Sequence, residues 1–459
     1  MTDRGAERGT AAGPASAASA APSAAARSSA AAARSSAARS SAAAPSAAAF
    51  PAGLAEAERV ELTVDAVAPG GHCVARVDGQ VVFVRHALPG ERVIAEVTEV
   101  HRGFVRADAV TVLDPSPDRV EPQCPYAKPG ACGGCDLQHV SPAGQLAWKT
   151  AVVREQLTRL GGLTEAELDR LGVRVEALPG GLLGWRSRVR YAVDAADRAG
   201  LLKHRSHEVV PIDRCRIAHP AIQQLPVLTS TGASWPAAEA VETVASTGGD
   251  VTVTEVRDGA STPVSGPTEV REVAAGRDWT LPASAFWQVH PAAADTLATA
   301  VLELLDPRPG EVAWDLYGGA GLFAAGLAAR VGPTGRVTLV EAAAQGVAAA
   351  RSNLADLPTV EVVSARVETA LARRRITGPV DVVVLDPPRS GAGAPVVRAL
   401  VAAGPRAVAY VACDPAAFAR DVRTFAGLGW RLAALRGFDL FPMTQHVEQV
   451  GLLLPPAGR

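Results

Sequence analysis

The sequence predicts an α/β protein: a C-terminal doubly wound parallel sheet, preceded by an N-terminal β-barrel and a mixed central domain. Three observations lead to this prediction. Short alternating apolar segments run from Val60 to about Val112, a cysteine-bearing segment follows, and apolar strands alternate with helices from about Leu281 onward. With 459 residues, the chain has room for about three domains.

Composition narrows the possible functions. A net charge of -2 gives no global attraction to nucleic acid, so RNA binding would depend on local arginine patches. No run of 18 or more apolar residues occurs, and we expect no membrane span. Residues 1–52 are rich in Ala and Ser and are expected to form a disordered tail, which we favour over an organellar transit peptide.

Residues 53–115 are expected to form the barrel. "VELTVDAVA", "HCVARVDGQVVFV", "ERVIAEVTEV" and "FVRADAVTVL" have strand patterns, with a hairpin signal at Asp78-Gly79 and a turn in "ALPGE". Several short strands at regular spacing indicate a small closed barrel. Such barrels commonly bind oligonucleotides, although the fold alone does not establish this.

Residues 116–280 are expected to form the central domain. "GQLAWKTAVVREQLTRLGG" has apolar residues at helical spacing and ends at Gly161-Gly162, whereas the region from about Leu225 to Gly266 predicts irregular strands and loops. "WRSRVRY" places three arginines on one strand face, where they either contact phosphate or form a solvated surface: Arg186, Arg188 and Arg190.

Residues 281–459 carry the signals of a nucleotide-like cofactor site. "DLYGGAGLF" places glycines between a strand and a helix, where backbone can approach a ligand closely. Glu341 ends the next strand, where a carboxylate can bind both hydroxyls of a ribose; its alternative role is a solvated helix cap. The G-G-x-G spacing behind an acidic residue suits S-adenosylmethionine better than NAD.

Two further strand ends carry reactive groups. In "LDPPRSG", two prolines hold the carboxylate of Asp386 rigidly, and Arg389 suits a phosphate or a carboxylate. In "YVACDPA", Cys413 follows an apolar strand directly. From this stretch alone, a small buried filler is favoured over a nucleophile, because free cysteines are usually buried.

Taken in order, "DLYGGAGLF", "LDPPRSG", "YVACDPA" and "DLFPMTQHVEQVGLL" resemble the S-adenosylmethionine-dependent RNA uracil-5-methyltransferases. The barrel with "ALPGE" resembles the TRAM domain of the members that act on 23S rRNA, and the resemblance covers nearly everything after residue 55. It implies a Rossmann-like methyltransferase domain, an OB-like TRAM barrel, and methyl transfer to carbon 5 of uridine in 23S rRNA.

The resemblance also implies roles for individual residues. Cys413 would add to carbon 6 of the uracil and Glu448, in "HVE", would remove the proton from carbon 5. The residues expected to bind the cofactor or line its pocket are Gln288 of "FWQVHP", Tyr317, Glu341 and Asp386. The sequence departs from the family at Asp414, where Asn is common, and at Leu322, where some relatives have a polar residue.

Four cysteines are candidate metal ligands: Cys124, Cys132, Cys135 and Cys215. A metal site is favoured over structural thiols by the "CGGC" pair, and disulfides are not expected in a cytosolic enzyme. Their spacing does not separate zinc from a 4Fe-4S cluster. The family resemblance favours a 4Fe-4S cluster and an iron-sulfur central domain, with zinc as the less favoured metal; Cys73 is expected in the barrel core.

We therefore expect a cytoplasmic, monomeric enzyme whose partner is RNA, with large-subunit rRNA favoured over tRNA. The alternatives are a tRNA uracil-5-methyltransferase, a non-catalytic RNA-binding protein that kept the fold, and an enzyme that methylates a non-nucleic substrate.

Overall fold

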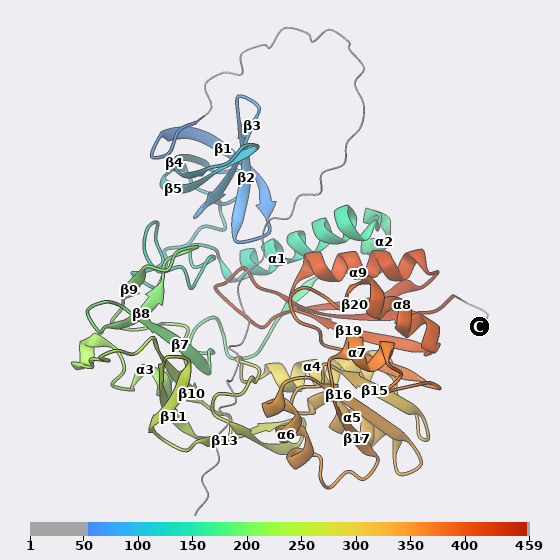
Figure 1. The fold of residues 1–459 in the computed structure, drawn as a ribbon. Helices are drawn as coiled ribbons and strands as arrows, with labels where there is room; N and C mark the ends of the chain where they lie inside the picture. The colour runs from blue at the N-terminus through green and yellow to red at the C-terminus, as the bar shows by residue number, and fades with distance from the viewer. Residues whose placement is uncertain (1–53, 457–459) are drawn as a thin grey trace, which may run out of the picture. The chain divides into compact units, whose positions relative to one another are not determined.

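The structure is a computed structural model that describes residues 54–456 (Figure 1). The tail expected over residues 1–52 lies outside these residues. Within the described part of the chain, no helix is both long and apolar enough to span a bilayer.

Five strands close the N-terminal barrel in the order β1-β2-β3-β5-β4. Their bounds are β1 Arg59–Ala68, β2 His72–Val77, β3 Gln80–Arg85, β4 Arg92–Val100 and β5 Phe104–Asp114. The predicted hairpin is confirmed, since Asp78 and Gly79 both have positive φ (49° and 84°), which a tight two-residue turn between twisted strands requires. Cys73 is fully buried in the barrel core, as expected.

Helix α1 (Pro142–Gln156) follows the cysteine-bearing segment, and Ser141 caps it by accepting a hydrogen bond from the amide of Gly144. The helix continues as one π-helical turn, η1 (Leu157–Gly161), and stops where Gly162 adopts a φ of 78°, so the predicted end is confirmed. A short helix α2 (Glu165–Arg170) follows.

The central domain contains a six-stranded sheet in the order β12-β11-β10-β7-β8-β9. Its strands are β7 Arg188–Val193, β8 Ala199–Leu202, β9 Val209–Pro211, β10 Ala240–Ala245, β11 Val251–Arg257 and β12 Ala260–Ser265, with the short helices α3 Pro220–Gln223 and η2 Thr229–Thr231. The irregular region predicted from Leu225 to Gly266 thus forms three regular antiparallel strands. A two-stranded ribbon, β13 (Glu269–Ala274) and β14 (Arg277–Pro282), leads into the last domain.

The C-terminal sheet has eight strands in the order β17-β16-β15-β18-β19-β21-β20-β6. They are β6 Val175–Ala177, β15 Val312–Leu316, β16 Arg336–Glu341, β17 Val360–Ser364, β18 Val382–Leu385, β19 Ala407–Ala412, β20 Arg431–Asp439 and β21 Glu448–Leu454. Strands β15 to β19 are parallel, which confirms the doubly wound sheet, and β21 lies antiparallel between β19 and β20. Strand β6, from far upstream, completes the edge beside β20. The domain boundaries at 115 and 280 stay predictions.

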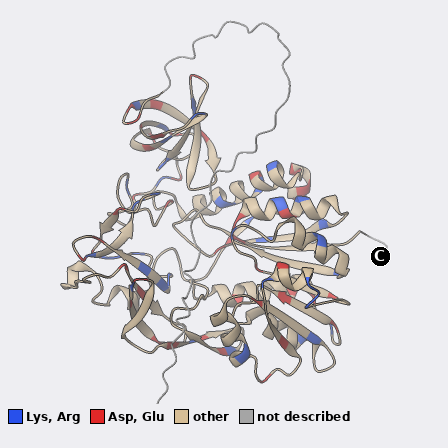
Figure 2. Ribbon diagram, in the orientation of Figure 1, with Lys and Arg blue, Asp and Glu red and all other residues tan. Residues whose placement is uncertain are grey.

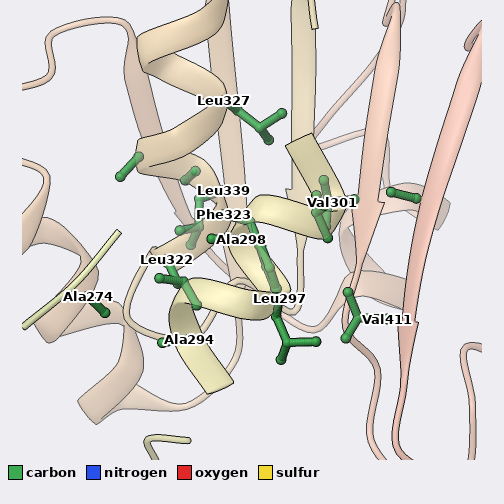
Figure 3. Close-up of a cluster of buried hydrophobic side chains, with 14 of the residues drawn as sticks. Ala274, Ala294, Leu297, Ala298, Val301, Leu322, Phe323, Leu327, Leu339 and Val411 are labelled. Carbon is green, nitrogen blue, oxygen red and sulfur yellow. The ribbon is translucent and has the colours of Figure 1, made fainter. Parts of the chain in front are cut away.

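Helices cover both faces of this sheet (Figure 1). They are α4 Ala293–Leu305, α5 Leu322–Val331, α6 Ala344–Asn353, α7 Val367–Ala372, α8 Gly393–Ala403 and α9 Pro415–Gly427. Figure 3 shows part of the core on one face, where Leu297 of α4 and Phe323 of α5 belong to the same buried cluster as Leu339 of β16. On the other face α7, α8 and α9 pack together with α1 and η1. Two covered faces explain why these strands are continuously apolar.

Candidate active site

One pocket of about 650 Å³ lies at the carboxyl ends of β15, β16, β18 and β19, where open α/β sheets bind ligands. All six side chains assigned above to catalysis or cofactor binding line it: Gln288, Tyr317, Glu341, Asp386, Cys413 and Glu448. The structure thus brings together residues from five separate motifs. Their individual roles stay predictions.

The glycine-rich loop between β15 and α5 has no room for a side chain at two of its positions. A Cβ on Gly318 would lie 2.5 Å from Cγ of Leu339, and one on Gly321 would lie 2.6 Å from Cδ1 of Leu354. Gly321 also has a φ of 101°, which residues with a side chain rarely adopt. Tyr317 has a positive φ of 64° although it is not glycine. Backbone therefore forms this wall of the pocket, and a ligand can approach it closely.

Asp315 holds the loop from within the sheet. It is fully buried, and its Oδ2 accepts a hydrogen bond from the amide of Ala324 in α5 (2.8 Å). Its Oδ1 has no partner among the described residues. The pKa of Asp315 is raised to about 7, chiefly by burial and also by the nearby Asp386 and Glu341 carboxylates, while the hydrogen bond from Ala324 opposes them.

Glu341 is fixed at the edge of the pocket by backbone amides. Its Oε2 accepts a hydrogen bond from Gly319 of the glycine loop (2.9 Å), and its Oε1 accepts from Ala342 and Ala343 (2.7 and 2.5 Å). A carboxylate has about four lone-pair positions, so these three bonds leave about one position for a hydroxyl donor, and binding a second hydroxyl requires an amide bond to be shared. The expected ribose-binding role is compatible with this geometry.

Cys413 and Glu448 face the pocket from neighbouring strands. Ala412 of β19 pairs with Gln449 of β21, so Cys413 lies opposite Glu448 one residue beyond the last pair. Side chains opposite each other in antiparallel strands point to the same face, with Cβ atoms about 5 Å apart. Asp386 lines the same pocket from the end of β18.

The acidic groups of this pocket hold their protons strongly. The pKa of the Cys413 thiol is raised to about 11, chiefly by burial and also by Glu448 and Asp386, while Arg389 opposes them. Burial also raises the pKa of Glu448 well above its ordinary value and that of Asp386 to about 7. A thiolate at Cys413 therefore requires a positive charge in the pocket or a proton acceptor near it.

Phe286 and His446 are among the lining residues that were not identified from the sequence. Phe286 lines the pocket although its side chain is 78% exposed, a placement typical of an aromatic group that stacks on a ligand. His446 also lines it, and burial together with Arg389 and Lys149 lowers its pKa to about 4, so the imidazole is neutral at physiological pH. Phe286 stood in the quoted "FWQVHP", but its exposure has no sequence signal.

The loop before Glu448 is held by distant parts of the chain. The carbonyl of Met443 accepts hydrogen bonds from the amides of Asp136 and Leu137 (3.0 and 2.9 Å). The amide of Gln445 donates to Oδ2 of Asp136 (3.2 Å), and the Gln445 side chain accepts from Gly70 of the barrel (3.0 Å). Barrel and cysteine-bearing segment together therefore position the approach to Glu448.

The four candidate metal-binding cysteines line one cavity: Cys124, Cys132, Cys135 and Cys215. Burial raises the pKa of Cys132 to about 11, and the neighbouring thiols of Cys215 and Cys124 raise it further. Nevertheless, no group of three or more His, Cys, Asp or Glu side chains within residues 54–456 is arranged to hold a metal ion. The structure therefore gives no support for the expected metal site beyond the gathering of four thiols.

Glycine is required in the "CGGC" pair for a steric reason. A Cβ on Gly133 would lie 2.3 Å from the backbone nitrogen of His204, and the amide of Gly133 donates to the carbonyl of Leu202 (2.9 Å). Close packing of the cysteine segment on this backbone thus explains part of the motif without a metal.

The three arginines of "WRSRVRY" have different surroundings. Arg188 is held by Glu272 (2.7 Å) and by the carbonyls of Ala283 and Ala285, so it fixes the segment before Gln288 rather than contacting phosphate. Arg190 is exposed and pairs with Glu242. The three arginines therefore do not share one solvated face, and phosphate contact by Arg186 or Arg190 stays a prediction.

Comparison with known proteins shows which families this chain is similar to. A family model described as "TRAM domain" matches residues 55–110, and one described as "tRNA (Uracil-5-)-methyltransferase" matches residues 276–456. An uncharacterized RNA methyltransferase of Streptomyces avermitilis is 48% identical over 432 residues, covering 87% of this chain and 99% of the relative.

Two more similar proteins have a named substrate. A 23S rRNA (uracil(1939)-C(5))-methyltransferase of Thiobacillus denitrificans is 33% identical and covers 83% of this chain and 96% of its own. The crystal structure of a Pyrococcus abyssi tRNA (uracil-54, C5)-methyltransferase superposes with a TM-score of 0.65 at 23% identity, over 86% of this chain and 99% of that one. At that identity the similarity shows a shared fold.

Proposed function

The chain belongs to the RNA uracil-5-methyltransferase family, and we propose that it transfers the methyl group of S-adenosylmethionine to carbon 5 of a uridine in 23S rRNA through a covalent Cys413 adduct. The observation that carries the proposal is the position of Cys413 opposite Glu448 in one pocket.

The reaction needs a nucleophile and a base on the same face of the uracil ring system. Carbon 5 of uracil is a weak nucleophile until a thiolate bonds to carbon 6 and moves electron density to carbon 5. Carbon 5 then takes the methyl group, and S-adenosylhomocysteine leaves. Glu448 accepts the remaining proton of carbon 5, and the bond between Sγ of Cys413 and carbon 6 breaks, which restores the ring and the thiolate.

The raised pKa values of the acidic groups in the pocket are compatible with a reaction that starts only when the methyl donor is bound. Burial raises the pKa values of Cys413, Glu448 and Asp386, and so favours their protonated forms before the methyl donor binds. A sulfonium cation beside them favours the ionised forms. Glu341 and Gln288, which line the same pocket, would orient the donor.

The test uses unmodified 23S rRNA transcript and its 5-fluorouridine form. With fluorine at carbon 5, Glu448 has no proton to remove, so a denaturation-resistant adduct should accumulate in the wild type. Cys413→Ala should form no adduct and transfer no methyl group, whereas Glu448→Gln should form the adduct even on unmodified RNA and release it slowly. Methyl transfer that survives Cys413→Ala would refute the covalent mechanism.

The choice of RNA rests on relatives with different named substrates. The 33% identical relative is named as a 23S rRNA enzyme, and the TRAM barrel accompanies that resemblance, which favours large-subunit rRNA over tRNA. Nucleoside mass spectrometry of both RNAs from a deletion strain and its parent decides the question. Loss of 5-methyluridine from tRNA alone would favour the tRNA alternative, and loss from neither would favour a non-catalytic RNA-binding protein.

We also propose that the four gathered thiols bind a 4Fe-4S cluster. Four cysteine side chains are a suitable donor set for such a cluster, and all four line one cavity, although as placed they do not form a metal-binding group. Protein purified without oxygen should be brown and contain about four iron and four sulfide ions. Zinc without iron, or neither metal, would refute the cluster.

We also propose that the protein is cytoplasmic and monomeric. All six cysteines are free in the structure, as expected in a reducing compartment. Light scattering of the full chain in solution tests the oligomeric state, and a mass of twice 47.1 kDa would contradict a monomer.

A further inference from the structure

A second groove, of about 320 Å³, adjoins the candidate active site; we call it the flanking groove. It shares Arg389, Cys413 and His446 with the active-site pocket. Its other walls include Gly70 of the barrel turn between β1 and β2 and Arg205 of the turn between β8 and β9. Residues of the barrel, the central domain and the catalytic domain thus meet directly beside the nucleophile.

A third depression, of about 560 Å³, lies along the central sheet; we call it the basic groove. Its basic lining residues are Arg190, Lys203, His204, Arg205 and His207. Arg205 belongs to both the basic groove and the flanking groove. The three depressions therefore form one connected path that leads from the central sheet to Cys413.

The arginines on this path differ in whether their charge is already neutralised. Lys and Arg are interspersed with Asp and Glu over the described elements (Figure 2). Lys203 pairs with Glu208 (2.5 Å) and Arg190 pairs with Glu242. In contrast, Arg205 and Arg389 are exposed and form no ion pair with any residue between positions 54 and 456. They are the available guanidinium groups at the two ends of the flanking groove.

The surroundings of Arg205 are unusual for a cation that serves only as a solvated surface group. Its backbone has a φ of 53°, a conformation that costs energy for a residue with a side chain. Partial desolvation lowers the pKa of this exposed side chain, and the neighbouring Arg106 and Arg85 lower it further, while the Glu99 carboxylate opposes them. An anion placed between these guanidinium groups relieves that repulsion.

We propose that the flanking groove and the basic groove hold the single-stranded RNA next to the target uridine, with Arg205 and Arg389 binding its phosphates. This inference rests on the proposed function and extends it from the target base to the adjoining chain. A base stacked inside an A-form duplex cannot reach a half-buried thiol, so the target uridine must be turned out of the stack, and the grooves beside the thiol are where the adjoining nucleotides can continue. Arginine offers the bidentate geometry that phosphate needs.

The experiment measures binding of unmodified 23S rRNA transcript, without methyl donor, over a series of KCl concentrations. Arg205→Gln should weaken binding about fivefold and reduce the slope of log affinity against log salt by about 0.7, the contribution of one single-stranded phosphate contact. Arg205→Lys keeps the charge and should keep the slope. Arg398→Gln, an exposed arginine of α8 outside all three depressions, is the matched control and should change neither quantity.

The results distinguish the loss of a phosphate contact from a disturbed fold and from a failure of the proposed function. An unchanged slope in Arg205→Gln would overturn the proposal, and so would an equal loss in Arg205→Lys, because the strained turn would then be the cause. Oligoadenylate and an RNA duplex of equal length test strandedness: the loss should appear only with oligoadenylate, and an equal loss with the duplex would overturn the single-stranded assignment. Failure of the wild type to methylate any RNA would refute the proposed function, while the salt slopes still test the groove.

Discussion

Cys413 lies opposite Glu448 at the point where β19 and β21 stop pairing, one residue beyond Ala412 and Gln449. The antiparallel insertion of β21 into an otherwise parallel sheet creates this relationship, because it brings a carboxylate from the C-terminal end of the chain beside the strand that ends in the thiol. Each group makes the other harder to ionise, and the first prediction follows from that coupling.

Alkylation of Cys413 by iodoacetamide should rise steadily with pH up to about 10 in the absence of ligands, because burial and Glu448 raise the thiol pKa to about 11. Glu448→Gln cannot ionise, so at every pH where the wild-type carboxylate is charged, the thiol of the variant should ionise more readily and its alkylation should be several-fold faster. Site-resolved mass spectrometry gives the rate at Cys413 separately from the other cysteines. Equal rates in both proteins would show that the two side chains are not coupled.

Glu341→Gln should raise the KM for S-adenosylmethionine about tenfold and change kcat much less. The variant loses the charge that strengthens hydrogen bonds to ribose hydroxyls, worth about 1.5 to 3 kcal/mol per charged bond. Glu361→Gln, on the neighbouring strand β17 and exposed, should leave both constants unchanged. A fall in kcat at an unchanged KM would place Glu341 in a different role.

The buried ion pair of Lys149 and Asp439 should behave as a unit. The two groups are 2.5 Å apart and almost fully excluded from solvent. Lys149→Met leaves the Asp439 carboxylate buried without its partner, which costs about 3 to 5 kcal/mol. Adding Asp439→Leu should recover most of the loss in thermal midpoint. The exposed pair of Arg159 and Glu155 is the control, since Arg159→Met should cost under about 1 kcal/mol.

Asp315→Asn should stabilise the protein at high pH and change it little at low pH. The folded pKa of Asp315 is about 7 against an ordinary 3.8, so its favourable contribution is complete below about pH 4 and is lost as the pH rises through 7. Asparagine keeps an acceptor for the amide of Ala324 and does not ionise. The gain at pH 8 should be on the order of 4 kcal/mol, since the pKa is raised by about 3 units and each unit corresponds to about 1.4 kcal/mol.

Thermal midpoints from pH 4 to 8, without methyl donor, check this prediction. Asp65→Asn on the barrel surface is the matched control, because Asp65 is exposed and its replacement should give a difference that does not depend on pH. A difference between Asp315→Asn and the wild type that stays constant over the range would contradict the raised pKa.

Local patterns in the sequence predicted much of the fold. The barrel hairpin at Asp78-Gly79, the end of the first long helix and the parallel strands were predictable because turn residues and strand periodicity are properties of short segments. The region from Leu225 to Gly266 was not, since Thr, Gly and Pro give weak strand signals and pairing with β7 determines its order. Strand β6 has three residues and no pattern of its own.

The residues of the candidate site were likewise predictable from the sequence only in part. Residues at strand ends, such as Glu341 and Asp386, were predictable because the carboxyl edge of a parallel sheet gathers them. The flanking groove was not predictable, because it depends on Gly70 and Arg205 meeting Cys413 across regions far apart in the sequence. Whether Arg188 contacts phosphate or Glu272 was likewise decided by a partner that no local pattern indicates.

The position of β6 beside β20 affects how this protein is made. The barrel strands all lie within Arg59–Asp114 and can pair while the ribosome is still translating the rest of the chain. Strand β6 must wait for β20, and Cys413 must wait for Glu448, until translation reaches the last residues. A nascent chain stalled before residue 431 would expose the apolar side of α1 without its partner strand, so it would need protection from aggregation, and no active enzyme would exist until synthesis is complete.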